Sequence, residues 1–360
     1  MLLFLYRFYV LPILKTERIY YMVTIKDIAS ATGVSATTVS NVINGKAGRV
    51  SAETVAKINK AIDDLGYVPN MSARSLVSRS SKVIGFVNHI VTNKDSNFME
   101  DPFLSRFIGI LEQVLRENGY FLMLRTVETP EQFKAFLKTW DLDGLFLAGI
   151  FRDDFFEAIA SCAKKLPIVL VDSYVHEKNI CNVGLEDFGG SNQSTKYLIS
   201  KGHRKIAFAS LHIKEGGVLM ERFLGYKAAL TEAGIPFDDA LVFECGMDLE
   251  NTKHIAKYLA SHPEITGLVT TADFLAGNIM ANLHKEGVRI PEDISIVGFD
   301  DLNICNITTP ALTTVHQDMD LKGRTAVKFM LELLEHRIPN PCEVSLPTSI
   351  VERESVRSIF

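Results

Sequence analysis

Apolar residues recur at helical spacing in three short segments near the start of the chain, residues 25–31, 36–43 and 52–65. Thr24, Ser35 and Ser51 stand just before these segments, where a hydroxyl accepts hydrogen bonds from the unpaired amides of a first helical turn. Gly33 and Gly66 follow the first and third segments, where helices commonly end in a residue with positive φ. The pattern therefore predicts three capped helices.

The first two helices have the pattern of a helix-turn-helix. Their apolar residues would pack together: Ile25, Ile28, Ala29, Val34, Val39 and Ile43. This packing leaves Ala36, Thr37, Ser40 and Asn41 on the outer face of the second helix. In a helix-turn-helix that face enters the DNA major groove. An ordinary two-helix corner within a core is the alternative, and we favour the DNA-binding interpretation.

From residue 82 the pattern changes to alternating strands and helices. Strand-like apolar runs occur at residues 83–88, 120–125, 144–148, 168–171, 206–210, 267–271 and 294–299. Helical patterns occur at residues 104–118, 130–138, 153–164, 188–201, 219–233, 251–261, 274–286 and 318–335. This alternation predicts an α/β body, either one large parallel sheet or two smaller doubly wound lobes. A ligand would lie beyond the strands' carboxyl ends, which carry Asn88, Asp172, Asp273 and Asp300.

Two further segments lie outside these patterns. Residues 69–81 are polar and serine-rich, and form either a flexible tether or a short helix that folds against DNA. Residues 1–22 begin with an apolar run that ends at Leu14 and is interrupted by Arg7 and Pro12. This run is shorter than the ~20 residues of a spanning helix. A membrane anchor or signal is the alternative. We favour a start-site artefact, a non-native extension ahead of a native start at Met22.

Charge is divided unevenly along the chain, whose formal total is −5. Residues 23–80 carry +3, whereas residues 81–360 carry −10. A basic head on an acidic body fits a protein that touches phosphates with one end only. At 360 residues the chain is long enough for more than one domain.

The sequence gives no support for catalysis or for a bound cofactor or metal. It contains neither a phosphate-binding glycine loop, nor a G-x-S-x-G elbow, nor an H-E-x-x-H motif. The five cysteines are scattered, without a C-x-x-C pair. We therefore expect inert core thiols in a reducing cytosol, with neither a disulfide framework nor a zinc site.

Several segments together resemble the LacI/GalR family of bacterial transcription regulators, from Met22 to the carboxyl end. They are VTIKDIASATGVSATTVSNVING, VSAETVAKI and LGYVPNMSARSL in the head, with GHRKIAF, ERFLGYKAAL, ISIVGFDD, TPALTTVHQDMDLKG and VERESV in the body. The resemblance implies a body like periplasmic sugar-binding proteins, with two lobes, three crossover segments and an effector in the cleft. It also implies homodimers that present two heads to a palindromic operator.

The resemblance implies a set of DNA-contacting residues: Thr24, Ser35, Ala36, Thr37, Thr38, Asn41, Asn44, Ala73, Arg74 and Leu76. Ala36, Thr37 and Asn41 would read bases. Asn41 replaces an arginine of many relatives, and Asn pairs with adenine where Arg prefers guanine. Ser35 and Thr38 would reach phosphates. Leu76 would wedge into the minor groove beside the small Ala73, although Val77 replaces a lysine found in some relatives.

The resemblance also implies effector contacts at Asp172, Arg222 and Asp300, with Gln317 lining the cleft. Asn88 lies at a strand end, and Phe98, Phe103 and Phe274 could stack on a ligand. Arg222 as a surface ion pair and Asp300 as a strand-end cap are the alternatives. A carboxylate–guanidinium set suits sugar hydroxyls, so a sugar is favoured over a nucleobase. Ala272 departs from the Asn of many sugar-binding relatives.

We therefore expect a cytoplasmic, homodimeric repressor that binds operator DNA under the control of a small ligand, without a membrane partner. Its domains would be a helix-turn-helix at residues 23–68, a hinge helix at 69–81 and a two-lobed effector-binding and dimerisation domain at 82–360. The alternatives are a sugar-binding protein without a regulatory role, and a regulator that responds to a nucleobase or a protein co-repressor. The sequence does not decide whether ligand releases or promotes DNA binding.

Overall fold

The computed structural model describes residues 23–46, 48, 50–68, 80–89, 98–149, 154–163, 165–175, 180–246, 250–339 and 342–360. The chain separates into two compact units, residues 1–77 and 78–360. This division falls inside the predicted connector at residues 69–81. Most of that connector lies outside the described residues, and Ser80 and Ser81 are described but not helical.

The first unit is a three-helix head, as predicted. Its helices are α1 (Ile25–Thr32), α2 (Ala36–Ile43) and α3 (Ala52–Leu65). Ile28, Ala29, Val39 and Ile58 form its buried centre. Gly33 and Gly66 take φ values of 67° and 66° and end α1 and α3, which is the conformation that favours glycine at a helix end.

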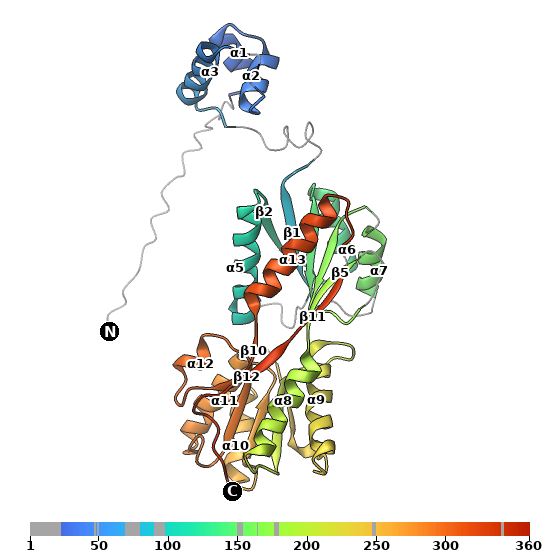
Figure 1. The fold of residues 1–360 in the computed structure, drawn as a ribbon, viewed down its shortest axis with the longest axis vertical. Coiled ribbons are helices and arrows are strands. Elements are labelled where there is room, and N and C mark those ends of the chain that lie inside the picture. Colours follow the sequence, from blue (N-terminus) through green and yellow to red (C-terminus); the bar gives the residue numbers. More distant parts are fainter. Residues whose placement is uncertain are drawn as a thin grey trace, which may run out of the picture. The chain divides into compact units, whose positions relative to one another are not determined.

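The second unit contains two six-stranded sheets (Figure 1). Of the two predicted possibilities, one large sheet or two lobes, the structure has two lobes. The first lobe has the order β11-β5-β4-β3-β1-β2. Its strands are β1 (Val83–Asn88), β2 (Phe121–Thr126), β3 (Gly144–Ala148), β4 (Ile168–Val171), β5 (Cys181–Leu185) and β11 (Glu343–Leu346). Its helices are η1 (Phe98–Glu100), α5 (Pro102–Glu117), α6 (Pro130–Thr139), α7 (Asp154–Cys162) and α13 (Met319–Leu334).

The second lobe has the strand order β12-β10-β9-β8-β6-β7. Its strands are β6 (Ile206–Leu211), β7 (Val242–Cys245), β8 (Gly267–Thr270), β9 (Ser295–Asp300), β10 (Thr313–Gln317) and β12 (Thr348–Val351). Its helices are α8 (Asp187–Ser200), α9 (Val218–Glu232), η2 (Asp239–Leu241), α10 (Thr252–Ser261), α11 (Asp273–Lys285) and α12 (Ile304–Ile307). All strand pairs are parallel except β10 with the carboxyl-terminal β12.

Three segments cross between the lobes, from β5 to α8, from β10 to α13 and from β11 to β12. The carboxyl ends of β4 and β9 and the start of α13 therefore lie near the crossovers. This arrangement puts the polar strand ends predicted from the sequence where residues of both lobes can meet.

The entry of the chain into the body is held by one carboxylate. Asp143 accepts hydrogen bonds from the Ser80 hydroxyl at 2.5 Å, the Ser81 amide at 2.7 Å and the Lys82 amide at 3.1 Å. Asp143 stands directly before β3. These bonds therefore fix Ser80, Ser81 and Lys82 to the sheet of the first lobe.

The expectation of five free thiols is wrong. Cys181 at the start of β5 and Cys342 directly before β11 form a disulfide, with their Cα atoms 4.7 Å apart. Parallel pairing places these residues side by side, because Asn182 is in register with Glu343. The two residues are 161 positions apart in the sequence, so their spacing gave no sign of the pairing. Cys162, Cys245 and Cys305 take no part in a disulfide.

None of the described helices is both long and apolar enough to cross a membrane. Among the same described residues, no three His, Cys, Asp or Glu side chains are grouped as a metal site would require.

Candidate functional site

The proposed DNA-binding face is presented by two capped helices. The Thr24 hydroxyl accepts from the Asp27 amide, and the Asp27 carboxylate accepts from the Thr24 amide at 2.8 Å, which completes a capping box on α1. The Ser35 hydroxyl accepts from the Thr38 amide at 3.1 Å and caps α2. These local bonds fix where α2 begins and therefore which side chains its outer face carries.

The outer face of α2 is open to a partner. Ser35, Ala36, Thr37 and Asn44 are exposed, whereas Thr38 and Asn41 are half-buried. The Ser35 and Thr38 hydroxyls lie 2.8 Å apart and bond to each other. The Asn44 amide donates to the Ser40 hydroxyl at 3.3 Å. The remaining proposed DNA contacts, Ala73, Arg74 and Leu76, lie outside the described residues.

In the body, two acidic residues follow strands with an unusual backbone. Asp172 comes directly after β4 with φ of 50°, and Asp300 ends β9 with φ of 113°. Residues other than glycine rarely take such φ values, and Asp is among the few that tolerate the left-handed region. Backbone strain of this kind is found mainly at functional sites. Here it sets the direction of two carboxylates at the lobe ends.

Arg222 on α9 is buried, with its side chain 9% exposed. Its Nε donates to Asp187 at 2.8 Å, its Nη1 donates to the Thr271 carbonyl at 2.5 Å, and Nη1 lies 3.6 Å from Asp300. The guanidinium also stacks 3.6 Å above the Phe299 ring. Arg222 is therefore not a surface ion pair, and Asp300 is more than a strand-end cap.

Lys322 on α13 brings three of the predicted effector residues together. Its ammonium donates to both Asp172 carboxylate oxygens, at 2.7 and 2.9 Å, and to Gln317 Oε1 at 2.7 Å. It also lies 5.4 Å from the centre of the Phe103 ring. The Lys322 side chain is 1% exposed, so it is a fixed part of the site.

These contacts form one chain across both lobes. Gln317 Nε2 donates to Asp300 at 2.6 Å and so joins the Lys322 cluster to Arg222. At the other end, the Tyr174 hydroxyl of the first lobe donates to Asp187 at 2.8 Å. We call this set the interlobe chain; its members are Asp172, Lys322, Gln317, Asp300, Arg222, Asp187 and Tyr174.

Burial sets the electrostatics of the interlobe chain. Burial raises the pKa of Asp300 well above its ordinary value, while the positive charge of Arg222 opposes that shift. Burial likewise raises the pKa of Asp187 against the same cation. Burial lowers the pKa of Arg222, but Asp187 and Asp300 outweigh it, so this pKa is raised. Arg222 thus offsets only part of the effect of burial, and the pKa values of both carboxyl groups stay raised.

The other predicted effector residues lie on β1, η1 and α11. Asn88 is fully buried at the end of β1. Phe98 in η1 packs against the core of the first lobe. Phe274, the second residue of α11, is half-buried.

The sequence analysis missed Lys322, Asp187 and Tyr174. A signal for Lys322 was present, because it lies in the apolar stripe of Met319, Ala326 and Met330 at helical spacing, where a charged residue needs a buried partner. Asp187 and Tyr174 gave no comparable signal, since their contacts depend on how the crossover from β5 to α8 is folded.

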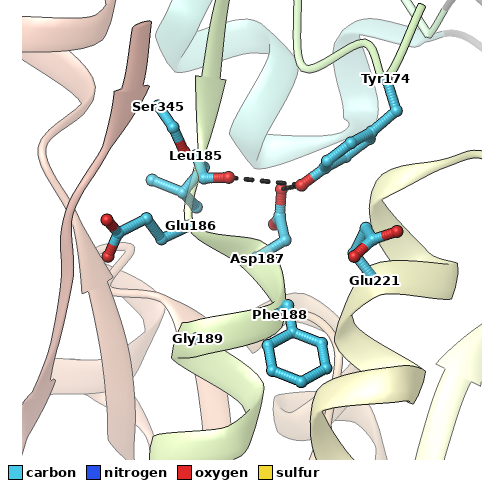
Figure 2. A pocket seen from close by; sticks show the side chains of 8 residues that line it. All are labelled: Tyr174, Leu185, Glu186, Asp187, Phe188, Gly189, Glu221 and Ser345. Atoms are coloured by element: carbon cyan, nitrogen blue, oxygen red, sulfur yellow. Dashed lines mark hydrogen bonds between the residues drawn. The ribbon is translucent and has the colours of Figure 1, made fainter.

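A pocket of about 290 Å³ opens beside Asp187 and Tyr174 of the interlobe chain (Figure 2). Its lining residues are Tyr174, Leu185, Glu186, Asp187, Phe188, Gly189, Glu221 and Ser345. Figure 2 shows the Tyr174 hydroxyl directed at the Asp187 carboxylate. The pocket contains none of the predicted effector residues.

Comparisons with known proteins match both units. Residues 24–70 match a family model described as "Bacterial regulatory proteins, lacI family", and residues 195–356 match "Periplasmic binding protein-like domain". The chain is 32% identical over 346 residues to the HTH-type transcriptional repressor PurR of Vibrio atlanticus, covering 94% of this chain and 100% of that protein.

Two solved structures show the same similarity. A complex of the transcriptional regulator CelR with cellobiose is 28% identical with a TM-score of 0.68, covering 92% of this chain and 99% of that one. A Lac repressor dimer bound to operator and the anti-inducer ONPF is 25% identical with a TM-score of 0.79, covering 93% and 99%. The first of these structures contains cellobiose, and the second contains operator DNA and ONPF.

Proposed function

The chain belongs to the LacI family of bacterial transcription regulators, and on that premise we propose that it represses transcription under the control of a sugar-like effector held between its lobes. As a family member it is a DNA-binding regulator that acts as a dimer on operator DNA, and it is not an enzyme. The proposal concerns which residues perform these steps and what the ligand is.

The proposed control by an effector rests on the contacts of the interlobe chain. Lys322 with Gln317, and Tyr174 with Asp187, join side chains of the two lobes. A ligand that exchanges hydrogen bonds with this chain would bind the open and closed arrangements with different affinity. That difference is what a ligand needs in order to shift a conformational equilibrium.

A sugar fits the hydrogen-bonding groups of the interlobe chain. Carboxylate oxygens of Asp172 and Asp300 accept hydrogen bonds from hydroxyl groups, and the Gln317 amide both donates and accepts. Phe103 supplies an aromatic face beside Lys322. The cellobiose bound by CelR is a ligand of this kind.

On the DNA side, we assign base readout to Ala36, Thr37 and Asn41 of α2, and phosphate contacts to Ser35 and Thr38. Thr24 and Asn44 flank the two helices and would complete the phosphate contacts. In the connector, Leu76 would insert between base steps at the operator centre, with Ala73 and Arg74 beside it. Unstacking a base step costs a few kcal/mol, which the contacts of the bent DNA offset.

The domain boundaries follow from these roles. Residues 23–68 form the DNA-binding head, residues 69–81 the connector that carries Leu76, and residues 82–360 the effector-binding and dimerisation body. Because the head would bind operator DNA, we place the protein in the cytoplasm. Residues 1–22 have no part in the proposal.

Selection of DNA by the full chain from a random library tests the proposed DNA-binding roles. We expect enrichment of a palindrome whose two half-sites match two heads of one dimer. Replacement of Leu76 by Ala should weaken binding to the selected palindrome far more than binding to unrelated DNA. An equal loss on both DNAs would remove the wedge role, and enrichment of no sequence would contradict sequence-specific binding.

A further inference from the structure

Lys322 places a positive charge in the middle of the proposed effector site. Its ammonium has three N–H donors, and three acceptors surround it: the two Asp172 oxygens and Gln317 Oε1, all within 2.9 Å. Every donor of this cation is therefore in use. With its side chain 1% exposed, Lys322 has no unsatisfied donor to offer to an incoming anion.

The second cation of the site is engaged in the same way. Arg222 is bound to Asp187 and lies 3.6 Å from Asp300. The interlobe chain therefore holds two cations that are already paired with acidic side chains, Lys322 with Asp172 and Arg222 with Asp187, and a third acidic side chain, Asp300, lies beside Arg222. A phosphate or carboxylate entering the site would find neither cation free and would face the charge of the paired carboxylates at low local dielectric, where charge repulsion is strong.

An anion could gain Lys322 only by displacing Gln317 or Asp172. In place of Gln317 it would lie directly beside the Asp172 carboxylate, which stays on the same ammonium. In place of Asp172 it would leave that carboxylate without its counter-ion in a largely buried site, since its side chain is 16% exposed. Breaking one partner out of a buried ion pair is strongly unfavourable. Hydroxyl groups face no such barrier, because each carboxylate oxygen accepts more than one hydrogen bond and can keep Lys322 while binding a ligand.

We propose that Lys322, by neutralising Asp172 from within, makes the cleft select an uncharged polyhydroxyl effector and reject phosphorylated and acidic sugars. This inference rests on the proposed effector role of the interlobe chain and adds the charge class of the ligand. Lys322 acts as a specificity-determining residue: it holds Asp172 and Gln317 as fixed acceptors and carries no free charge of its own.

Ligand binding by the purified full chain, without DNA, tests the proposal. The probes are matched sets: ribose with ribose 5-phosphate; glucose with glucose 6-phosphate and gluconate; cellobiose with cellobionate. Thermal shift and calorimetry give the affinities, because a ligand that binds the folded state raises its stability. We expect an uncharged member to bind and its anionic counterparts to bind at least about tenfold more weakly. A smaller difference, the reverse order, or no uncharged binder at millimolar concentration overturns the proposal.

Two variants test the part played by Lys322. Asp172→Asn removes the counter-ion and leaves Lys322 with uncompensated charge, so the penalty on the anionic probes should fall by about tenfold. Asp293→Asn is the control, since this residue pairs with Arg289 on the surface and the penalty should not change. An Asp172→Asn protein that keeps the wild-type penalty contradicts the role of Lys322.

Should Asp172→Asn fail to fold, Lys322→Met decides the same point. It adds one net negative charge to the site, so glucosamine should gain about tenfold in affinity relative to glucose. Lys205→Met removes a surface lysine paired with Glu264 and serves as its control. Operator binding by the same samples distinguishes failure of this inference from failure of the proposed function. Intact DNA binding with an anionic ligand preference overturns only this inference, whereas loss of DNA binding in the wild type would contradict the proposed function.

Discussion

Asn41 sits on the outer face of α2 with its side chain half-buried, and an asparagine amide forms two hydrogen bonds with the edge of an adenine. Arginine forms its best pair with guanine. Replacing Asn41 by Arg should therefore move the preference at one symmetric pair of operator positions toward G, by about 1–3 kcal/mol. Sequencing of DNA selected by the two proteins measures this shift.

Gln113→Arg is the matched control for that substitution, because it adds the same charge on the exposed surface of α5 in the body. It should leave the selected sequences unchanged. An Asn41→Arg protein that selects the wild-type palindrome would refute base readout by this residue.

Asp273 is buried at the start of α11 and accepts hydrogen bonds from the Leu302 amide at 2.8 Å and the Thr314 hydroxyl at 2.5 Å. Burial raises its pKa to about 6, against an ordinary value of 3.8. The folded state therefore favours the protonated acid, and the stability this contributes is lost as the pH rises from about 4 through 6.

The expected result is a pH-dependent difference in unfolding free energy between Asp273→Asn and the wild type. It should shift in favour of the variant by up to about 3 kcal/mol between pH 4 and pH 7, measured by denaturant unfolding. Asp293→Asn should give a nearly flat difference from pH 5 upward, because its ion pair with Arg289 lowers the pKa of Asp293 to about 2. A flat profile for Asp273→Asn would show that this carboxyl ionises normally in the folded protein.

Residues whose role is local were predicted from the sequence. Thr24 and Ser35 cap their helices and Gly33 ends α1, because each acts on amides or dihedrals within a few positions. Lys322 escaped the same reasoning. Its main partner Asp172 lies 150 residues away in the sequence, and only the fold brings that carboxylate to its ammonium.

At the scale of elements, a close contact between two helices of the second lobe depends on one glycine. Gly225 on α9 faces α8, and a methyl group there would meet the Phe188 carbonyl and the Asn192 amide. Asn192 also donates to the Gly225 carbonyl at 3.3 Å. Gly225→Ala should therefore destabilise the body by about 1–3 kcal/mol through overpacking.

Gly109→Ala on α5 is the matched control, because an added methyl group there meets no atom within 4 Å. It should stabilise the helix by about 0.5–1 kcal/mol, since alanine loses less conformational freedom than glycine. Thermal unfolding of both variants measures the difference, and equal effects at the two positions would contradict the close approach of α8 and α9.

The Cys181–Cys342 disulfide holds β11 at the edge of the first lobe's sheet. Closing so long a loop stabilises a folded chain by about 2–5 kcal/mol. Adding dithiothreitol should therefore lower the melting temperature of the wild type but not that of Cys342→Ser. Cys162→Ser removes a free thiol and should keep the wild-type response. A wild type insensitive to reductant would show that the crosslink contributes nothing to stability.

The helices of eight residues or more were predicted to within two residues at each described end, because amphipathic spacing is a local signal. The short η1, η2 and α12 were not predicted. Strands β5, β7, β10, β11 and β12 were missed. Strands β7 and β11 are four residues long and partly exposed, so they lack the continuous apolar run that marked β3 and β4. Their identity comes from pairing with strands far away in the sequence, as for β11 with β5.

At the scale of the whole molecule, the family assignment follows from features spread over both units. The sequence places a +3 head before a −10 body, and the two sheets and three crossovers are those of a two-lobed binding protein. The β/α alternation alone left one sheet or two open, because strand order is a long-range property. The resemblance to LacI regulators supplied the correct alternative.

The central claim is that ligand binding at the interlobe chain controls operator binding. The most direct measurement is the operator affinity of the full chain with and without the uncharged sugar that binds it, for the wild type, Arg222→Ala and Arg324→Ala. We predict a change of about 5- to 150-fold for the wild type and for Arg324→Ala, which loses only exposed ion pairs with Asp320 and Glu117. Arg222→Ala should bind the operator with or without sugar at equal affinity. An unchanged wild-type affinity, or a retained response in Arg222→Ala, would contradict the account.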